Sequence, residues 1–261
     1  MVKRSLASRR RSCRWRSGTF YSKKAEVTAM TASTGFHWLA YQQLLDSALP
    51  IGGFSHSFGL ETLVQQERLR TVDELEDYIR SMLAGSWATA DAMVIKAAYA
   101  CIPVNNLPQL WQIDRMLHVQ RASSEARTGV QKMGRRLLQL TRSMYPELNW
   151  APLDEAVTAE RCGCTHALVH GWVSYHLGVP LDNAVEGYLY CCIVTCVNSA
   201  LRLMSMGQTQ GQMLLAKLVP LTGSEWQRVA HLDPMDAYTN TPAADLAMMQ
   251  HETLYSRLFM S

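Results

Sequence analysis

The sequence of 261 residues lacks any stretch in which apolar and polar residues alternate over the length of a strand between turn residues. It also lacks a G-x-G-x-x-G loop, a Walker phosphate-binding loop and an internal repeat of fixed period. These absences argue against a sheet-based nucleotide-binding domain and against a solenoid. The apolar residues recur instead at helical spacing, which predicts an all-α chain.

The sequence also lacks a disulfide framework, because its cysteines are odd in number and three of them fall within one apolar helix. Buried cysteine in a reducing compartment behaves as a small apolar residue, so we expect a cytoplasmic protein. The seven are Cys13, Cys101, Cys162, Cys164, Cys191, Cys192 and Cys196.

The body of the chain has no excess of positive charge. Residues 1–30 carry nine basic residues and one acid, whereas residues 31–261 carry 16 basic and 21 acidic residues, a net charge of −5. This balance argues against a nucleic-acid groove. Residues 1–34 show no apolar periodicity and no hydrophobic signal region. Three interpretations stay open for them: an extension upstream of a start at Met30, a disordered basic tail, or a transit-like peptide.

One long apolar segment organises the rest. Residues 188–206 are apolar on nearly every side, within a helix predicted to start near Leu181 and to end in a left-handed cap at Gly207. A helix that is apolar all round is buried by other elements. A membrane span is the alternative, but the purely apolar run is shorter than the roughly 18 residues a span needs, and Asn198 and Arg202 lie near one end.

Shorter amphipathic segments before and after this helix are expected to cover it. Thr71 and Glu74 form a capping box before one of them, and Ser224 is expected to cap a late helix. We predict one helical-bundle-like domain of roughly eight to ten helices over residues 35–261, around a buried central helix.

Three side chains suggest a metal site. Cys162, His166 and His170 are four residues apart and would share one helical face, and cysteine and histidine suit zinc or nickel. The alternative is an ordinary packed helix, and no fourth ligand is obvious, so we assign no metal ligand or cofactor.

No arrangement suggests catalysis. Ser55 and Ser57 flank His56, but adjacent residues at a helix start point apart, so the hydroxyls more simply cap a helix. The acidic residues of the N-terminal third, Glu61 among them, have the spacing of a solvated helix face. We therefore predict no enzymatic activity.

Two segments suggest contacts with other proteins. The segment from Gly207 to Gln212 is polar, uncharged and rich in glycine and glutamine, which is typical of an interface loop. The segment after His251 is apolar at a position where chains usually fray, so it either folds back on the body or docks on a partner.

Four sequence blocks, in order, resemble the UreF family of urease accessory proteins. They are Asp46–Glu61 (DSALPIGGFSHSFGLE), Glu125–Leu137, Asn198–Gln212 with its Gly-Gln pairs, and His251–Phe259. Residues 1–34 have no counterpart in that pattern.

The resemblance implies an all-α dimer without enzymatic activity, acting in nickel insertion. Such proteins bridge a UreG-type GTPase to the H/D-type accessory protein and apo-urease, and are thought to modulate the GTPase. We expect the terminal segment to dock the H/D-type partner, and the other candidates to face the GTPase or the dimer. The partner-binding candidates are Tyr255, Arg257, Leu258, Phe259, Asn198, Arg202, Gln208, Gln212, Gly52, Gly53 and His56. The alternative function is a metal carrier that uses Cys162, His166 and His170.

Overall fold

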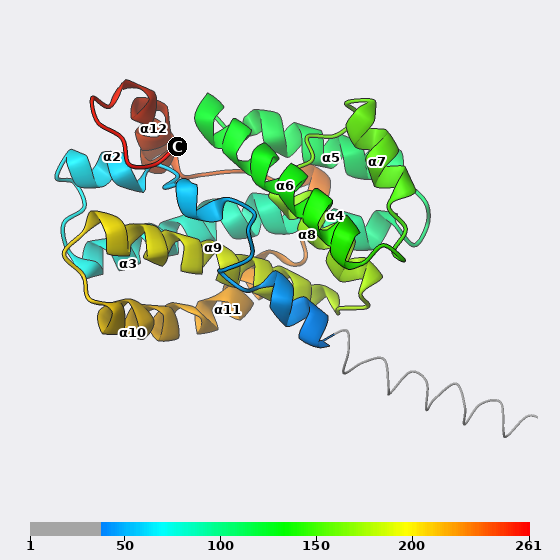
Figure 1. Ribbon diagram of the computed structural model, residues 1–261, viewed down its shortest axis with the longest axis horizontal. Coiled ribbons are helices and arrows are strands. Elements are labelled where there is room, and N and C mark those ends of the chain that lie inside the picture. The colour runs from blue at the N-terminus through cyan, green and yellow to red at the C-terminus, as the bar shows by residue number, and fades with distance from the viewer. Residues whose placement is uncertain (1–37) are drawn as a thin grey trace, which may run out of the picture.

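The computed structural model describes residues 38–261, so the predicted extension over residues 1–34 lies outside the described part (Figure 1). No strand occurs among the described residues, and the all-α prediction is confirmed. After a first helix over residues 38–44, the elements are η1 (Gly53–Ser55), α2 (Leu60–Gln65), α3 (Val72–Met82), η2 (Leu83–Asp91), α4 (Ala92–Cys101), α5 (Leu107–Gln120), α6 (Ser124–Met144), α7 (Ala151–Thr158), α8 (His166–His176), α9 (Leu181–Leu203), α10 (Gln208–Leu218), α11 (Pro220–Val229), η3 (Pro234–Asp236), α12 (Pro242–Gln250) and η4 (His251–Thr253).

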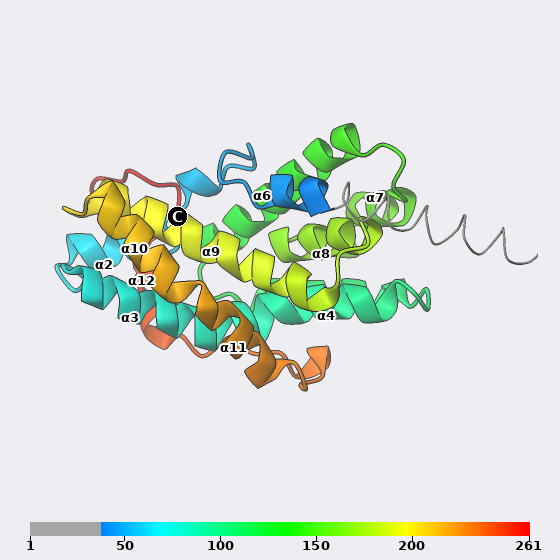
Figure 2. The ribbon, with the colours of Figure 1, turned by 90° about the horizontal axis from the view of Figure 1, so that it is seen from below.

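Helix α9 is the buried central helix that the sequence predicts. It packs against α4, α8, α10 and α11, and Figure 2 shows α10 and α11 crossing one side of it. Its length and composition would also allow a membrane span. However, 61% of its most apolar 18-residue stretch is buried within the fold. A core helix of a globular protein is also apolar on all sides, because each of its sides faces another helix.

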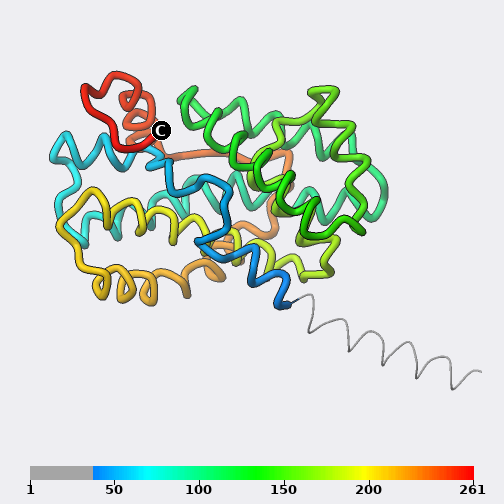
Figure 3. Tube along the Cα trace, in the orientation of Figure 1, coloured from blue at the N-terminus to red at the C-terminus, as the bar shows by residue number. Residues whose placement is uncertain are grey.

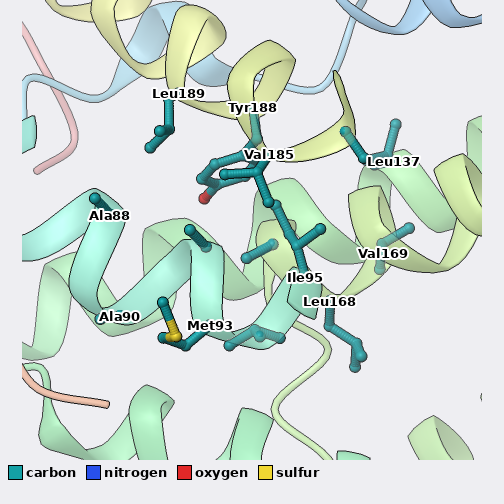
Figure 4. Close-up of a cluster of buried hydrophobic side chains, with 14 of the residues drawn as sticks. Ala88, Ala90, Met93, Ile95, Leu137, Leu168, Val169, Val185, Tyr188 and Leu189 are labelled. Carbon is teal, nitrogen blue, oxygen red and sulfur yellow. The ribbon is translucent and has the colours of Figure 1, made fainter. Parts of the chain in front are cut away.

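Helices α4, α6 and α8 build the core beside α9. Figure 4 shows Val185 and Tyr188 of α9 pointing toward Ile95 of α4, with Val169 of α8 and Leu137 of α6 beyond. All five side chains are almost completely buried. Close packing of this kind joins the helices into one hydrophobic core, which stabilises the fold through the apolar area removed from water.

A π-helical segment, η2, joins α3 and α4 into one continuous rod. Its carbonyl groups accept hydrogen bonds from a distant segment: Asn240 N donates to Gly85 O (2.7 Å) and Tyr238 N donates to Thr89 O (3.1 Å). These bonds fix the path of the chain between η3 and α12, and so help to place α12 on the outside of the bundle.

Several predicted boundaries can be compared directly. The Thr71–Glu74 capping box is confirmed at the start of α3. The left-handed cap at Gly207 is wrong, because α9 ends at an extended Met204 and Gly207 (φ −79°) instead begins α10. The cap at Ser224 is also wrong, since Pro220 already provides the first turn of α11.

Two glycines permit contacts that a side chain would block. A Cβ atom at Gly134 of α6 would lie 2.1 Å from the carbonyl oxygen of Cys164, and one at Gly187 of α9 would lie 2.0 Å from the Tyr41 hydroxyl. Gly134 therefore lets α6 approach the segment before α8, and Gly187 lets the first helix seat on α9.

Candidate docking surface

The segment after η4 folds back over the body and runs beside the residues that precede α2 (Figure 3). Met260 N donates to Ser55 O (2.8 Å), and the amides of Ser57 and Phe58 donate to Ser261 O (2.5 and 3.0 Å). The Ser57 hydroxyl donates to the same oxygen (2.9 Å). Of the two alternatives for this segment, it folds back, and it brings its own side chains to the Gly53–Ser55 turn.

Arg202 of α9 connects these two segments. Its Nη1 donates to Phe54 O (2.8 Å), and its guanidinium lies 4.5 Å from the centre of the Phe259 ring, a cation–π contact. The Ser199 hydroxyl, one turn earlier, donates to His56 O (3.3 Å). The end of α9, the turn after Gly52 and the terminal segment thus meet in one place.

The exposed side chains at this junction are largely apolar. Phe54 is 70% exposed, Leu258 53% and Met260 58%, and exposed Arg202 lies between the two segments. We call these four residues the docking patch. Tyr255, in the same terminal segment, is fully exposed. Exposed apolar residues gathered beside an arginine are typical of a protein–protein contact.

The remaining candidates separate into exposed and buried residues. Asn198 is exposed and lines a cleft together with Phe54 and Arg202. Gly53, His56 and Phe259 are buried and support the patch from behind. Gly52 has a left-handed backbone (φ 86°) that turns the chain into Gly53–Ser55.

Gln208 and Gln212 are exposed, but they lie on α10. Figure 1 shows α10 on the opposite side of α9 from the C-terminal end. The two glutamines therefore do not belong to the docking patch, and any partner that they contact approaches a different face.

His56 is a buried support and not an exposed contact. Its Nδ1 lies 2.7 Å from the Ser261 hydroxyl, and its ring stacks on Phe58. Burial, aided by the charge of nearby Lys132, lowers its pKa to about 4. The ring is therefore neutral at pH 7 and fixes the position of the terminal segment.

A hydrogen-bonded cluster of polar side chains, buried at Glu61 and His251 and exposed at Arg257, joins the terminal segment to α2 and α6. His251 is placed between two carboxylates, with Nε2 3.0 Å from Glu61 Oε2 and Nδ1 2.6 Å from Glu125 Oε2. Arg257 Nη1 donates to Glu125 Oε1 (2.6 Å). Glu61 also accepts the amide hydrogens of Leu258 (2.6 Å) and Phe259 (3.0 Å). We call Glu61, Glu125, His251 and Arg257 the clamp.

The placement of Glu61 departs from the predicted solvated helix face, since its side chain is almost completely buried. Burial alone would raise the pKa of this carboxyl group, but the hydrogen bonds from Leu258, His251 and Phe259 outweigh it and lower the pKa. The sequence does hold a signal for this burial. Glu61 lies between Leu60 and Leu63, two apolar residues that are buried in α2, and so it shares their inward face.

The predicted metal face does not form. Helix α8 begins at His166, because the Thr165 hydroxyl caps it by accepting from Leu168 N (3.2 Å), so Cys162 lies in the preceding loop. His170 Nε2 lies 3.1 Å from Ala184 O, so this ring nitrogen contacts the backbone. Over residues 38–261 no group of three or more His, Cys, Asp or Glu side chains is arranged to hold a metal ion.

An internal cavity lies behind the patch, between α6, α9 and η2. Its walls include the paired charges Asp91 and Arg121, the ring of His166, and thiols of α9. Burial raises the pKa of Cys191 and of Cys196 to about 12, so both thiols are protonated near neutral pH. Protonated thiols are poor nucleophiles and poor metal ligands, so neither role is favoured for these two cysteines.

The sequence is similar to known proteins over most of its length. The UreF family model matches residues 69–219. The urease accessory protein UreF of Bacillus sp. (strain TB-90) is 31% identical over 223 residues, which cover 85% of this chain and 98% of that protein. The UreF protein of Nostoc sp. (strain PCC 7120) is 32% identical over 231 residues, covering 88% and 99%. That of Streptococcus salivarius (strain 57.I) is 30% identical over 227 residues, covering 86% and 94%.

Proposed function

Because this chain belongs to the UreF family of urease accessory proteins, we propose that it acts as a non-catalytic adaptor during nickel insertion into urease. In this role it bridges a UreG-type GTPase to the H/D-type accessory protein and apo-urease, modulates the GTPase, and works as a cytoplasmic homodimer. The single observation that supports an adaptor is the docking patch.

The patch is assigned to the H/D-type partner. It combines an aromatic ring, two flexible apolar side chains and an arginine, and aromatic residues, methionine and arginine are enriched in protein–protein interfaces. The backbone that carries them is held by hydrogen bonds at both segments, so little ordering remains to oppose binding. The outer face of α10, with Gln208 and Gln212, is assigned to the GTPase or to the second protomer.

Co-purification with the other accessory proteins, followed by a urease activation assay, tests this function. We expect a stable complex with the H/D-type protein, and urease activity that depends on the adaptor. Failure of the purified chain to retain either the GTPase or the H/D-type protein would contradict the proposal.

The metal-carrier alternative makes a different prediction. It requires stoichiometric nickel binding by the isolated protein, lost in a His166→Ala, His170→Ala double variant. We expect wild type and variant to give the same calorimetric trace, because no three ligands converge among the described residues.

A further inference from the structure

We propose that three exposed cations on the outer face of α6 extend the partner surface and receive an acidic strip of the H/D-type accessory protein. They are Lys132, Arg135 and Arg136, and we call them the basic ridge. The inference rests on the proposed function, because the ridge adjoins the docking patch that is assigned to the same partner.

The charge of the ridge is all of one sign. Lys132 precedes Arg135 by three positions and Arg136 by four, and residues at these spacings are neighbours on a helix. Like charges at such spacings repel each other and weaken the helix. Residues 31–261 carry a net charge of −5, so the cluster also opposes the charge of the body. A local excess of this kind is typical of a surface that attracts an oppositely charged partner.

The ridge is not neutralised by acidic side chains of the chain itself. Within residues 38–261, none of its three cations forms an ion pair. Several exposed arginines elsewhere do pair with a nearby carboxylate, namely Arg70, Arg142, Arg161 and Arg228. Those positions have the mixed charge of a solvated face, and the ridge lacks it.

Helix α6 passes directly beside the docking patch (Figure 1). Arg136 Nε donates to Pro50 O (3.1 Å), just before the turn that carries the patch. A Cβ atom at Gly129 would lie 3.0 Å from the His56 ring and 3.4 Å from the Ser261 hydroxyl, so α6 touches the support of the patch as well. One partner can therefore cover the patch and the ridge together.

An acidic protein surface fits the ridge better than a membrane or a nucleic acid does. A guanidinium group can bind a carboxylate through two parallel hydrogen bonds, and the bond to Pro50 already restrains Arg136. Basic clusters that bind anionic lipids usually hold about four to eight cations, which is more than the ridge provides. The net negative body would also be repelled by either polyanion.

Reversal of charge tests the ridge in the full-length protein. The ridge variants are Arg135→Glu and the double variant Lys132→Glu, Arg135→Glu. Arg115→Glu on α5 is the matched control, because Arg115 is also exposed and forms no ion pair with a residue of the described part. We expect the ridge variants to melt no lower than wild type, since a glutamate at position 132 faces Arg136 four positions later.

The readouts are the affinity and the association rate for the purified H/D-type accessory protein at about 0.05 M and about 0.5 M salt. We expect wild type to bind more weakly at high salt. At low salt the double variant should bind about tenfold more weakly than wild type, mainly through slower association, with Arg135→Glu between them. At high salt the difference should shrink, and Arg115→Glu should match wild type throughout.

The outcomes separate the ridge from the proposed function. If wild type binds and the double variant has the same affinity and salt dependence, the ridge is only a solvated face and the inference is wrong. An equal loss for Arg115→Glu would show attraction by net charge alone, and would overturn it too. If wild type binds no H/D-type protein at either salt concentration, the proposed function fails and the inference falls with it.

A vesicle assay covers the membrane alternative. Wild type and the double variant are sedimented with phosphatidylcholine vesicles that do or do not contain phosphatidylserine. We expect no retention of either protein. Retention of wild type by the phosphatidylserine vesicles, lost in the double variant, would assign the ridge to a membrane and contradict the proposal.

Discussion

At the scale of single residues, the fold buries several imidazoles. His56, His166 and His170 each have a pKa lowered mainly by burial, to about 4, about 3 and about 4. A histidine that is neutral in the folded state and protonated in the unfolded state favours unfolding at acidic pH.

The stability of the protein should therefore fall as pH falls below about 6.5, the ordinary pKa of histidine in the unfolded chain. In that range the unfolded state binds protons that the folded state does not, so the free energy of unfolding decreases toward pH 4. Asp114 acts in the opposite sense, because burial raises its pKa to about 6. The contribution of a single histidine is therefore measured as the difference in the free energy of unfolding between wild type and a variant that lacks it.

Urea denaturation of wild type and His166→Phe at several pH values measures that difference. His166 packs edge-on against His170 and beside Tyr188, where a phenyl ring fits. We expect the variant to lose less stability than wild type between pH 6.5 and 4.5. Parallel curves would show that His166 is not a buried neutral imidazole.

Arg202 carries a second prediction at this scale. An Arg202→Ala variant loses the hydrogen bond to Phe54 O and the cation–π contact with Phe259. We expect it to fold normally, because the residue is exposed, and to bind the H/D-type partner about tenfold more weakly, as expected for loss of an interface arginine. Equal affinities, measured by calorimetry, would place Arg202 outside the interface.

At the scale of elements, the approach of α6 to the segment before α8 depends on Gly134. An alanine at this position would place its Cβ 2.1 Å from a backbone oxygen, which no side-chain rotation can relieve. We expect Gly134→Ala to destabilise the protein by about 2–4 kcal/mol, in the range of strongly overpacked core variants.

Gly207→Ala is the control for this prediction. Gly207 has an ordinary backbone conformation and only a distant side-chain neighbour, so the change should stay within about 0.5–1 kcal/mol. Thermal unfolding of the two variants compares them. Similar melting temperatures would mean that α6 does not pack on the Cys164–Thr165 backbone as described.

The elements were predictable where local sequence determines them. The capping box of α3 and the burial of α9 follow from short-range patterns, and both are confirmed. The start of α8 was not predictable from local sequence, because Asp114 holds the capping residue Thr165 in place. The Asp114 carboxylate accepts from the Thr165 hydroxyl (2.5 Å) and from Gly163 N (2.7 Å). Asp114 lies about fifty residues earlier, and no local pattern contains that information.

The candidate surface was predictable in its parts but not in its assembly. Sequence blocks around Gly52, Arg202 and Leu258 each suggested contacts with a partner. The structure joins the first and third blocks through backbone hydrogen bonds, and the Arg202 side chain bonds to the backbone of Phe54. Backbone bonds between distant segments leave no trace in the side-chain pattern. The clamp was missed for a different reason: its side chains come from distant parts of the chain, and Glu61 and His251 are 190 positions apart.

At the scale of the whole molecule, a helical core carries the docking patch on one face. Helix α9 supplies both: its apolar length is surrounded by other helices, and its polar end reaches Arg202 and the patch. Removal of the chain after Glu252 should therefore abolish binding of the H/D-type partner and leave helical circular dichroism almost unchanged. A large loss of helicity would mean that the terminal segment is required for folding.

Binding of the H/D-type accessory protein by the docking patch is tested most directly with a Leu258→Asp, Met260→Asp variant. The measurement is the affinity of the purified H/D-type protein for this variant. Its control is Val104→Asp, Val119→Asp, a pair of exposed apolar residues that lie outside both the patch and α10. We expect the patch variant to lose at least about 2 kcal/mol of binding free energy, roughly 30-fold in Kd, while the control binds as wild type does. Equal affinities for the patch variant and wild type would contradict this expectation.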